Sequence, residues 1–196
     1  MTAFPSLRLH ALDAAMADAW RAHFEDAQVV IGDILSTPVD AVVSPANSFG
    51  FMDGGIDLHY ARFFGGELQH ALRQRLLDAY DGELPVGQAL VLPTGHADVP
   101  YLVSAPTMRV PATIDRTVNV YLAFRAALLA VRRHNATAAP PIRRLAAPAL
   151  GAGVGAMPPA RVARQMHAAY AEVVLGETAW RTSARGVLAQ HAHLLQ

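Results

Sequence analysis

Two glycine-containing loops, each placed directly after a short apolar run, constrain this chain more than any other feature. The first loop follows the apolar residues 41–43 and continues to residues 53–57, which read DGGID; the second spans residues 148–155, which read PALGAGVG. Short apolar runs that end in turn residues are typical of buried strands. Because glycine frees backbone N–H groups to bind anions, two such loops about a hundred residues apart predict a ligand with two phosphates.

The composition favours one globular domain with a small partner. The chain has 196 residues, of which 53% are apolar, and its 16 basic residues balance its 16 acidic residues. That length suits a single core, and the zero net charge provides no general field for nucleic acid or an anionic membrane. The absence of cysteine excludes disulfides and thiolate chemistry, and no leader-like or membrane-spanning run is evident. We therefore expect a cytoplasmic protein without membrane contact.

Apolar periodicity predicts strands that alternate with helices. The expected strands are residues 7–12, 29–31, 41–43, 89–92, 101–103 and 142–147, and the expected helices are residues 14–24, 57–80, 117–134 and 160–175. We expect Asp13 to cap the first helix, Gly65-Gly66 to interrupt the second, and residues 135–141 to end the third. The strands at 29–31 and 41–43 are expected to be neighbours. This alternation predicts an α/β domain with helices on both faces of a mixed, largely parallel sheet.

In sequence the chain resembles the macrodomains, a family that binds ADP-ribose. The resemblance rests on Gly32-Asp33-Ile34, on residues 39–47, on Gly54-Gly55-Ile56-Asp57 and on residues 148–158, in the family's order and with its spacing. It implies a three-layer α/β/α fold and a single macrodomain over residues 1–196. The core motifs would span 29–174, with an N-terminal strand-helix extension at 1–28 and a C-terminal tail at 176–196. The loop pattern is most similar to MacroD-like members.

The resemblance also implies binding roles for individual residues. Asp33, with Ile34 beside it, would bind the adenine amine, while Asn47 would orient the distal ribose. The alternative interpretation of Asp33 is a residue that closes a turn, and that of Asn47 is an Asx turn. The remaining residues expected to contact the ligand are Ala46, Gly54, Gly55, Ile56, Gly151, Ala152, Gly153, Val154 and Gly155.

Asp57 is the most consequential residue of the predicted site. In MacroD-like ADP-ribosyl hydrolases a carboxylate at this position, together with a substrate phosphate, helps to position or activate water near the anomeric carbon. Asn47 is the second residue for which the resemblance implies a catalytic role. The alternative interpretation of Asp57 is an N-cap of the helix that follows it.

Three departures from the family pattern keep two functions open. Ser44 replaces the first Asn of the usual Asn-Ala-Ala-Asn, Gly155 replaces a common aromatic residue, and bulky side chains at residues 49–52 precede a shortened glycine run. One hypothesis is an enzyme that hydrolyses ADP-ribosyl linkages, acting on an ADP-ribosylated macromolecule. The other is a reader of ADP-ribose or a related NAD metabolite without catalysis. Neither needs a cofactor or a metal.

A third interpretation is a dinucleotide-binding oxidoreductase. Gly151, Gly153 and Ala156 satisfy the Gly-x-Gly-x-x-Gly/Ala spacing after a predicted strand. That fold requires an acidic residue about 20 positions later, at the end of the next strand. Glu172 is near this spacing but lies in a helical pattern.

Overall fold

The computed structural model describes residues 4–196, and within them six strands form one sheet in the order β2-β1-β6-β3-β5-β4. All neighbouring strands are parallel except β4, which runs antiparallel to β5. The sheet is therefore mixed and largely parallel, as predicted. Its strands are β1 (Ser6–Ala11), β2 (Gln28–Ile31), β3 (Ala41–Ser44), β4 (Leu90–Pro93), β5 (Tyr101–Ser104) and β6 (Arg144–Pro148).

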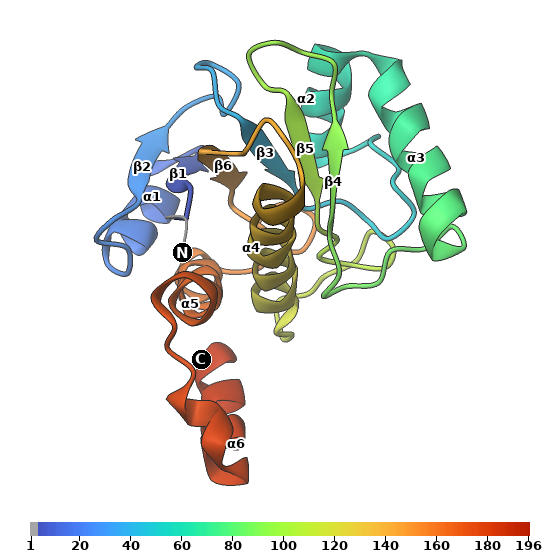
Figure 1. The fold of residues 1–196 in the computed structure, drawn as a ribbon. Coiled ribbons are helices and arrows are strands. Elements are labelled where there is room, and N and C mark those ends of the chain that lie inside the picture. Colours follow the sequence, from blue (N-terminus) through green and yellow to red (C-terminus); the bar gives the residue numbers. More distant parts are fainter. Residues whose placement is uncertain (1–3) are drawn as a thin grey trace.

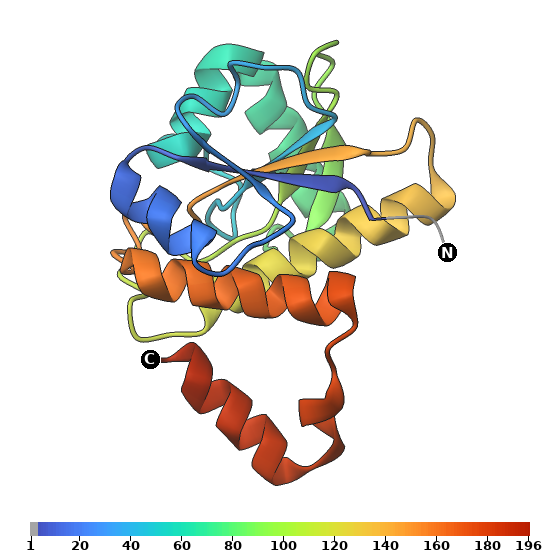
Figure 2. The ribbon, with the colours of Figure 1, turned by 90° about the vertical axis from the view of Figure 1, so that its left-hand side faces the viewer.

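Helices cover both faces of the sheet, which gives the predicted three-layer arrangement (Figures 1 and 2). One face is covered by α2 (Gly55–Phe64) and α3 (Gly66–Tyr80). The other is covered by α1 (Ala14–Arg21), α4 (Asn119–Thr137) and α5 (Pro159–Tyr170). Within residues 4–196, no helix has both the length and the apolar character needed to cross a membrane.

The core divides into two clusters because successive residues of a strand point to opposite faces of the sheet. On β3, Val43 belongs to the cluster that includes residues of α1, α4 and α5, whereas Val42 belongs to the cluster that includes residues of α2 and α3. All four residues of β3 are buried. This explains why β3 reads as a continuous apolar run rather than as an alternating pattern.

The order of the strands differs from the expectation in one respect. The segments 29–31 and 41–43 are not neighbours, because β1 and β6 lie between them and β2 forms the edge of the sheet. β1 pairs with β2 on one side and with β6 on the other, so the predicted N-terminal strand lies inside the sheet. Residues 1–3 of the predicted extension lie outside the described residues.

The predicted helices are all present, but their ends differ by a few residues: α1 ends at Arg21 rather than at residue 24, and α5 ends at Tyr170 rather than at residue 175. The Asp13 side chain caps α1 by accepting from the Met16 N–H at 2.9 Å, as predicted. Helix α4, however, continues through Asn135 to Thr137. The Asn135 side chain accepts from the Ile142 N–H at 2.8 Å and donates to the Ile142 carbonyl at 2.7 Å, so this polar residue fastens the helix end to the segment entering β6.

The C-terminal residues are attached through a buried acidic side chain. After α5 the chain continues as a π-helical segment, Ala171–Leu175, then a 3-10 turn, Ala179–Thr182, and α6 (Ala184–Leu194), which extends away from the sheet in Figure 2. The buried Glu172 accepts hydrogen bonds from Tyr121, Arg125 and Arg181. Burial opposes its ionisation, but the bonds from Tyr121 and Arg125 lower the pKa of Glu172 below its ordinary value. Glu172 therefore joins the segment after α5 to both α4 and the C-terminal turn.

We expect Glu172→Ala to lower the free energy of unfolding by about 2 kcal/mol, because it leaves two guanidinium groups and a buried phenol without their shared acceptor. Urea denaturation at pH 7 measures this change. The exposed Glu177→Ala is the matched control and should be nearly neutral. Equal stability of the two variants would contradict the structural role of Glu172.

Candidate ligand-binding site

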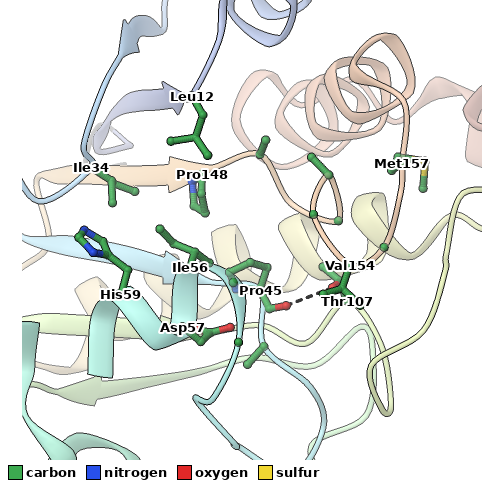
Figure 3. Close-up of a pocket in the computed structure, with 18 of the residues that line it drawn as sticks. Leu12, Ile34, Pro45, Ile56, Asp57, His59, Thr107, Pro148, Val154 and Met157 are labelled. Atoms are coloured by element: carbon green, nitrogen blue, oxygen red, sulfur yellow. Dashed lines mark hydrogen bonds between the residues drawn. The ribbon is translucent and has the colours of Figure 1, made fainter. Parts of the chain in front are cut away.

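A cavity of about 790 Å³ opens at the carboxyl ends of β1, β2, β3 and β6 (Figure 3). The ends of parallel strands that carry loops are the usual ligand-binding edge of an α/β sheet. Both glycine-containing loops meet here. The cavity is lined by every residue that the sequence places in the site, namely Asp33, Ile34, Ala46, Asn47, Gly54, Gly55, Ile56, Asp57, Gly151, Ala152, Gly153, Val154 and Gly155.

The first loop presents the N-terminus of α2 to the cavity. Gly54 is the N-cap residue, and no side chain accepts from the first-turn N–H groups. The N-cap interpretation of Asp57 is therefore wrong, since Asp57 is the third residue of the helix. An uncapped helix N-terminus has free donors and a positive dipole end, which together suit an anionic group.

The second loop presents three successive backbone donors. Among residues 4–196, the N–H groups of Gly153, Val154 and Gly155 have no hydrogen-bond acceptor. The glycines of this loop differ in the space around them. A Cβ atom on Gly155 would lie 2.5 Å from the Gly151 carbonyl oxygen, whereas a Cβ on Gly153 would meet nothing within 4 Å. Gly155 is thus required by packing, while Gly153 leaves open space beside the free donors.

Asp57 is almost fully buried at the floor of the cavity, with 7% of its surface exposed. It accepts a hydrogen bond from the buried hydroxyl of Ser44, at the end of β3. Burial raises the pKa of Asp57 to about 7, and the hydrogen bond from Ser44 partly opposes this rise. The carboxyl group can therefore exchange a proton near neutral pH, as a general acid or base must.

Asn47 is engaged within its own loop. Its side-chain oxygen accepts from the N–H groups of Phe49, at 3.0 Å, and Phe51, at 3.3 Å, while its amide nitrogen donates to the Phe51 carbonyl at 2.8 Å. The Asx-turn interpretation of Asn47 is thus the one seen in the structure. Asn47 lines the cavity but acts on its shape by fixing the loop that carries Phe51.

Asp33 closes a turn and also lines the cavity. Its Oδ1 atom accepts from the Leu35 N–H at 3.0 Å, which closes the turn after β2, and lies 2.8 Å from His59 Nε2. Although partial burial raises the pKa of Asp33, these hydrogen bonds outweigh it and lower the pKa below its ordinary value. A carboxylate therefore lines the cavity in contact with His59, which Figure 3 shows close to Ile34.

The cavity is also lined by residues outside the predicted site, among them two histidines, a leucine and a threonine. His10 and Leu12 come from the end of β1, His59 from α2, and Thr107 from the loop after β5. The Thr107 hydroxyl donates to the Pro45 carbonyl at 3.1 Å and so joins the loops after β3 and β5 (Figure 3). The position of His10 and Leu12 at the end of a predicted strand was the one available signal.

Comparison with known proteins identifies the family. The family model described as Macro domain matches residues 43–166. A protein of Aeropyrum pernix is 32% identical over 172 residues, covering 81% of this chain and 84% of the relative. A Macro domain-containing protein of Cupriavidus necator is 32% identical over 141 residues, covering 71% and 76%. This chain belongs to the macrodomain family.

Solved macrodomain structures share the fold. The macrodomain of Thermus aquaticus DarG matches with a TM-score of 0.60 at 22% identity, covering 84% of this chain and 90% of that chain. The Oceanobacillus iheyensis macrodomain with ADP matches with a TM-score of 0.55 at 21% identity, covering 69% and 70%. The three-layer fold of this macrodomain is therefore the family's fold.

The structure shows which contacts are made by the residues that depart from the family pattern. Ser44 bonds directly to Asp57. Phe51 lines the cavity with Arg73 stacked over its ring at 4.3 Å, whereas Phe49 lies outside the cavity beneath Arg109. Of the bulky residues of the first loop, Phe51 therefore contributes to the wall of the macrodomain cavity, and Phe49 does not.

The raised pKa of Asp57 predicts an unusual pH dependence of stability. Because the folded state holds this proton up to pH 7 while the unfolded chain releases it near pH 4, Asp57 opposes folding increasingly as pH rises through this window. Relative to Asp57→Asn, which removes the charge but keeps an acceptor for Ser44, we expect the wild type to lose about 2 kcal/mol between pH 5 and pH 8. Urea denaturation of both proteins at each pH measures this difference. A difference in the free energy of unfolding that stays the same at every pH would contradict the prediction.

Proposed function

We propose that this macrodomain binds ADP-ribose and hydrolyses ADP-ribosyl linkages, with Asp57 as the group that activates water. The observation that carries the proposal is the buried, protonatable carboxyl of Asp57 at the floor of a cavity flanked by two sets of backbone donors. Solved relatives in fold include a macrodomain with ADP, which supports a ligand of this class.

The cavity is suited to each part of such a ligand. Its volume lies within the roughly 300–1,000 Å³ of small-molecule sites. The N–H groups of residues 153–155 and the N-terminus of α2 would hold the two phosphates. The carboxylate of Asp33 would accept from the adenine amine, because an acceptor is the complement of an amine donor.

The hydrolysis that we propose uses Asp57 as a general base. Ionised Asp57 takes a proton from a water molecule, whose oxygen forms a bond to the anomeric carbon of the distal ribose. The bond from that carbon to the modified group breaks, the leaving group takes up a proton from solvent, and Asp57 then returns its own proton to solvent. The substrate's phosphate helps to position the water. Ser44 acts as a positioning residue, because its hydroxyl fixes one carboxylate oxygen of Asp57.

The second candidate is a reader of ADP-ribose without catalysis. It is favoured by the hydrogen bonds between the Asn47 amide and the backbone of Phe49 and Phe51. Because of these bonds, the amide is less available to bind the distal ribose. It is also favoured by Gly155, which offers no aromatic surface there. Turnover of an ADP-ribosylated protein separates the two functions.

The position of Glu172 disfavours the oxidoreductase interpretation. Glu172 lies in the π-helical segment after α5, buried among Tyr121, Arg125 and Arg181, and does not line the cavity. A dinucleotide-binding fold needs that carboxylate at the end of a strand beside the ribose.

Isothermal titration with ADP-ribose, AMP and intact NAD tests the binding proposal. We expect ADP-ribose to bind tightest, since AMP has one phosphate and no distal ribose, and NAD carries an added nicotinamide at the anomeric carbon above Asp57. Tighter binding of NAD, or no binding of ADP-ribose, would overturn the proposal.

A further inference from the structure

His10 is a buried histidine with no hydrogen-bond partner, although it lines the ligand cavity. It lies on β1, where it pairs in register with Val30 and Pro148, and only 4% of its surface is exposed. Neither ring nitrogen has a partner with hydrogen-bond geometry among the described residues. The Gly32 backbone is close enough to influence the ring's pKa but does not meet that geometry. A buried polar group without a partner destabilises the protein and calls for an explanation.

The position of His10 distinguishes it from the other buried side chains that lack partners. Trp20 Nε1 and Ser48 Oγ are also unpartnered, but neither residue lines the cavity. His10 lies near enough to Asp33 for each side chain to affect the other's pKa, and Asp33 in turn contacts His59. Together with the lining residues Ile34 and Leu12, we call this part of the cavity the base end. Apolar side chains at the base end suit the faces of a heteroaromatic ring, and polar side chains suit its edge.

The protonation state of His10 fits recognition of an uncharged ring. Burial lowers the pKa of His10 below its ordinary value, with a smaller contribution in the same direction from Arg8. At neutral pH the imidazole is therefore neutral and offers one N–H donor and one acceptor. A purine edge presents the matching pair, with ring nitrogens that accept and an amine that donates.

We propose that His10 is a specificity-determining residue of the base end, where its imidazole gains its missing hydrogen bond from the purine edge of the ligand. This inference rests on the proposed binding of ADP-ribose and adds to it a polar contact beside Asp33. In the ligand-free protein both nitrogens are covered, so binding of the base requires the ring to turn about its Cβ–Cγ bond. The unpartnered imidazole then destabilises the ligand-free protein, and ligand binding removes this destabilisation.

The proposal predicts opposite effects of one substitution on stability and on binding. His10→Leu replaces an unpartnered imidazole by an apolar side chain of similar size, so we expect the midpoint of thermal unfolding to rise or stay unchanged. The same variant should bind ADP-ribose about 10-fold more weakly in isothermal titration, as expected for the loss of one hydrogen bond. A ribose-diphosphate-ribose analogue without a base should bind equally to both proteins. His70→Leu, at an exposed position on α3 outside the cavity, is the control and should change neither quantity.

Three outcomes would count against this role. Equal affinity of wild type and His10→Leu for ADP-ribose overturns the inference and leaves the proposed function intact. An equal loss for ADP-ribose and for the base-free analogue also overturns it, because the substitution then acts on the cavity as a whole. Failure of the wild type to bind ADP-ribose overturns the proposed function, and the inference with it.

Discussion

Asp57→Asn should lower the rate of ADP-ribosyl hydrolysis by about 100-fold or more, in line with the usual contribution of a general base. The substitution removes the only carboxyl group that the structure buries at the cavity floor within residues 4–196, while keeping the side-chain shape and an acceptor for Ser44. ADP-ribose affinity should change less than threefold, because Asp57 acts on water rather than on the phosphates. Release of ADP-ribose from a modified protein, measured beside isothermal titration, gives both quantities.

The control and the pH profile make this result specific. Asp98→Asn, an exposed carboxylate outside the cavity, should leave the rate unchanged. The wild-type rate should rise with pH around a midpoint near 7, where Asp57 ionises. Ser44→Ala should move that midpoint to higher pH, because the Ser44 hydrogen bond lowers the pKa of Asp57. Equal rates for wild type and Asp57→Asn would remove Asp57 from catalysis and favour the reader function.

Gly153→Val should abolish most ADP-ribose binding without unfolding the protein. A Cβ atom at Gly153 meets nothing within 4 Å, so the ligand-free protein accommodates the side chain, but that side chain occupies the space beside the N–H groups of residues 153–155. We expect an affinity loss of about 100-fold, since the phosphate can no longer approach these donors. Isothermal titration and thermal unfolding measure the two effects.

Two other glycines supply the comparison. Gly155→Ala places Cβ against the Gly151 carbonyl and should lower stability by about 3 kcal/mol, with or without ligand. Gly66→Val, at an open glycine outside the cavity, should affect neither binding nor stability appreciably. If Gly153→Val bound ADP-ribose as the wild type does, the second loop would not be the phosphate site.

The sequence alone determined the fold class and the place of the site. Apolar runs predicted the strands, and glycine-containing loops after two of them, β3 and β6, predicted a cavity at the carboxyl ends of parallel strands. These features are local: a strand's burial and a glycine's missing side chain are both encoded within about ten residues. Every residue expected to contact the ligand lines the cavity for that reason.

Only the tertiary structure decided which side chains meet. The sheet places β1 between β2 and β6, although residues 6–11 and 144–148 lie at opposite ends of the chain, and this pairing brings His10 into the cavity. Ser44, which departs from the family pattern, forms a hydrogen bond to Asp57, the proposed catalytic group. Strand order and side-chain neighbours depend on contacts between distant segments, which local patterns do not specify. The tertiary structure likewise shows that the Asn47 side chain bonds the backbone of Phe49 and Phe51 while it lines the cavity.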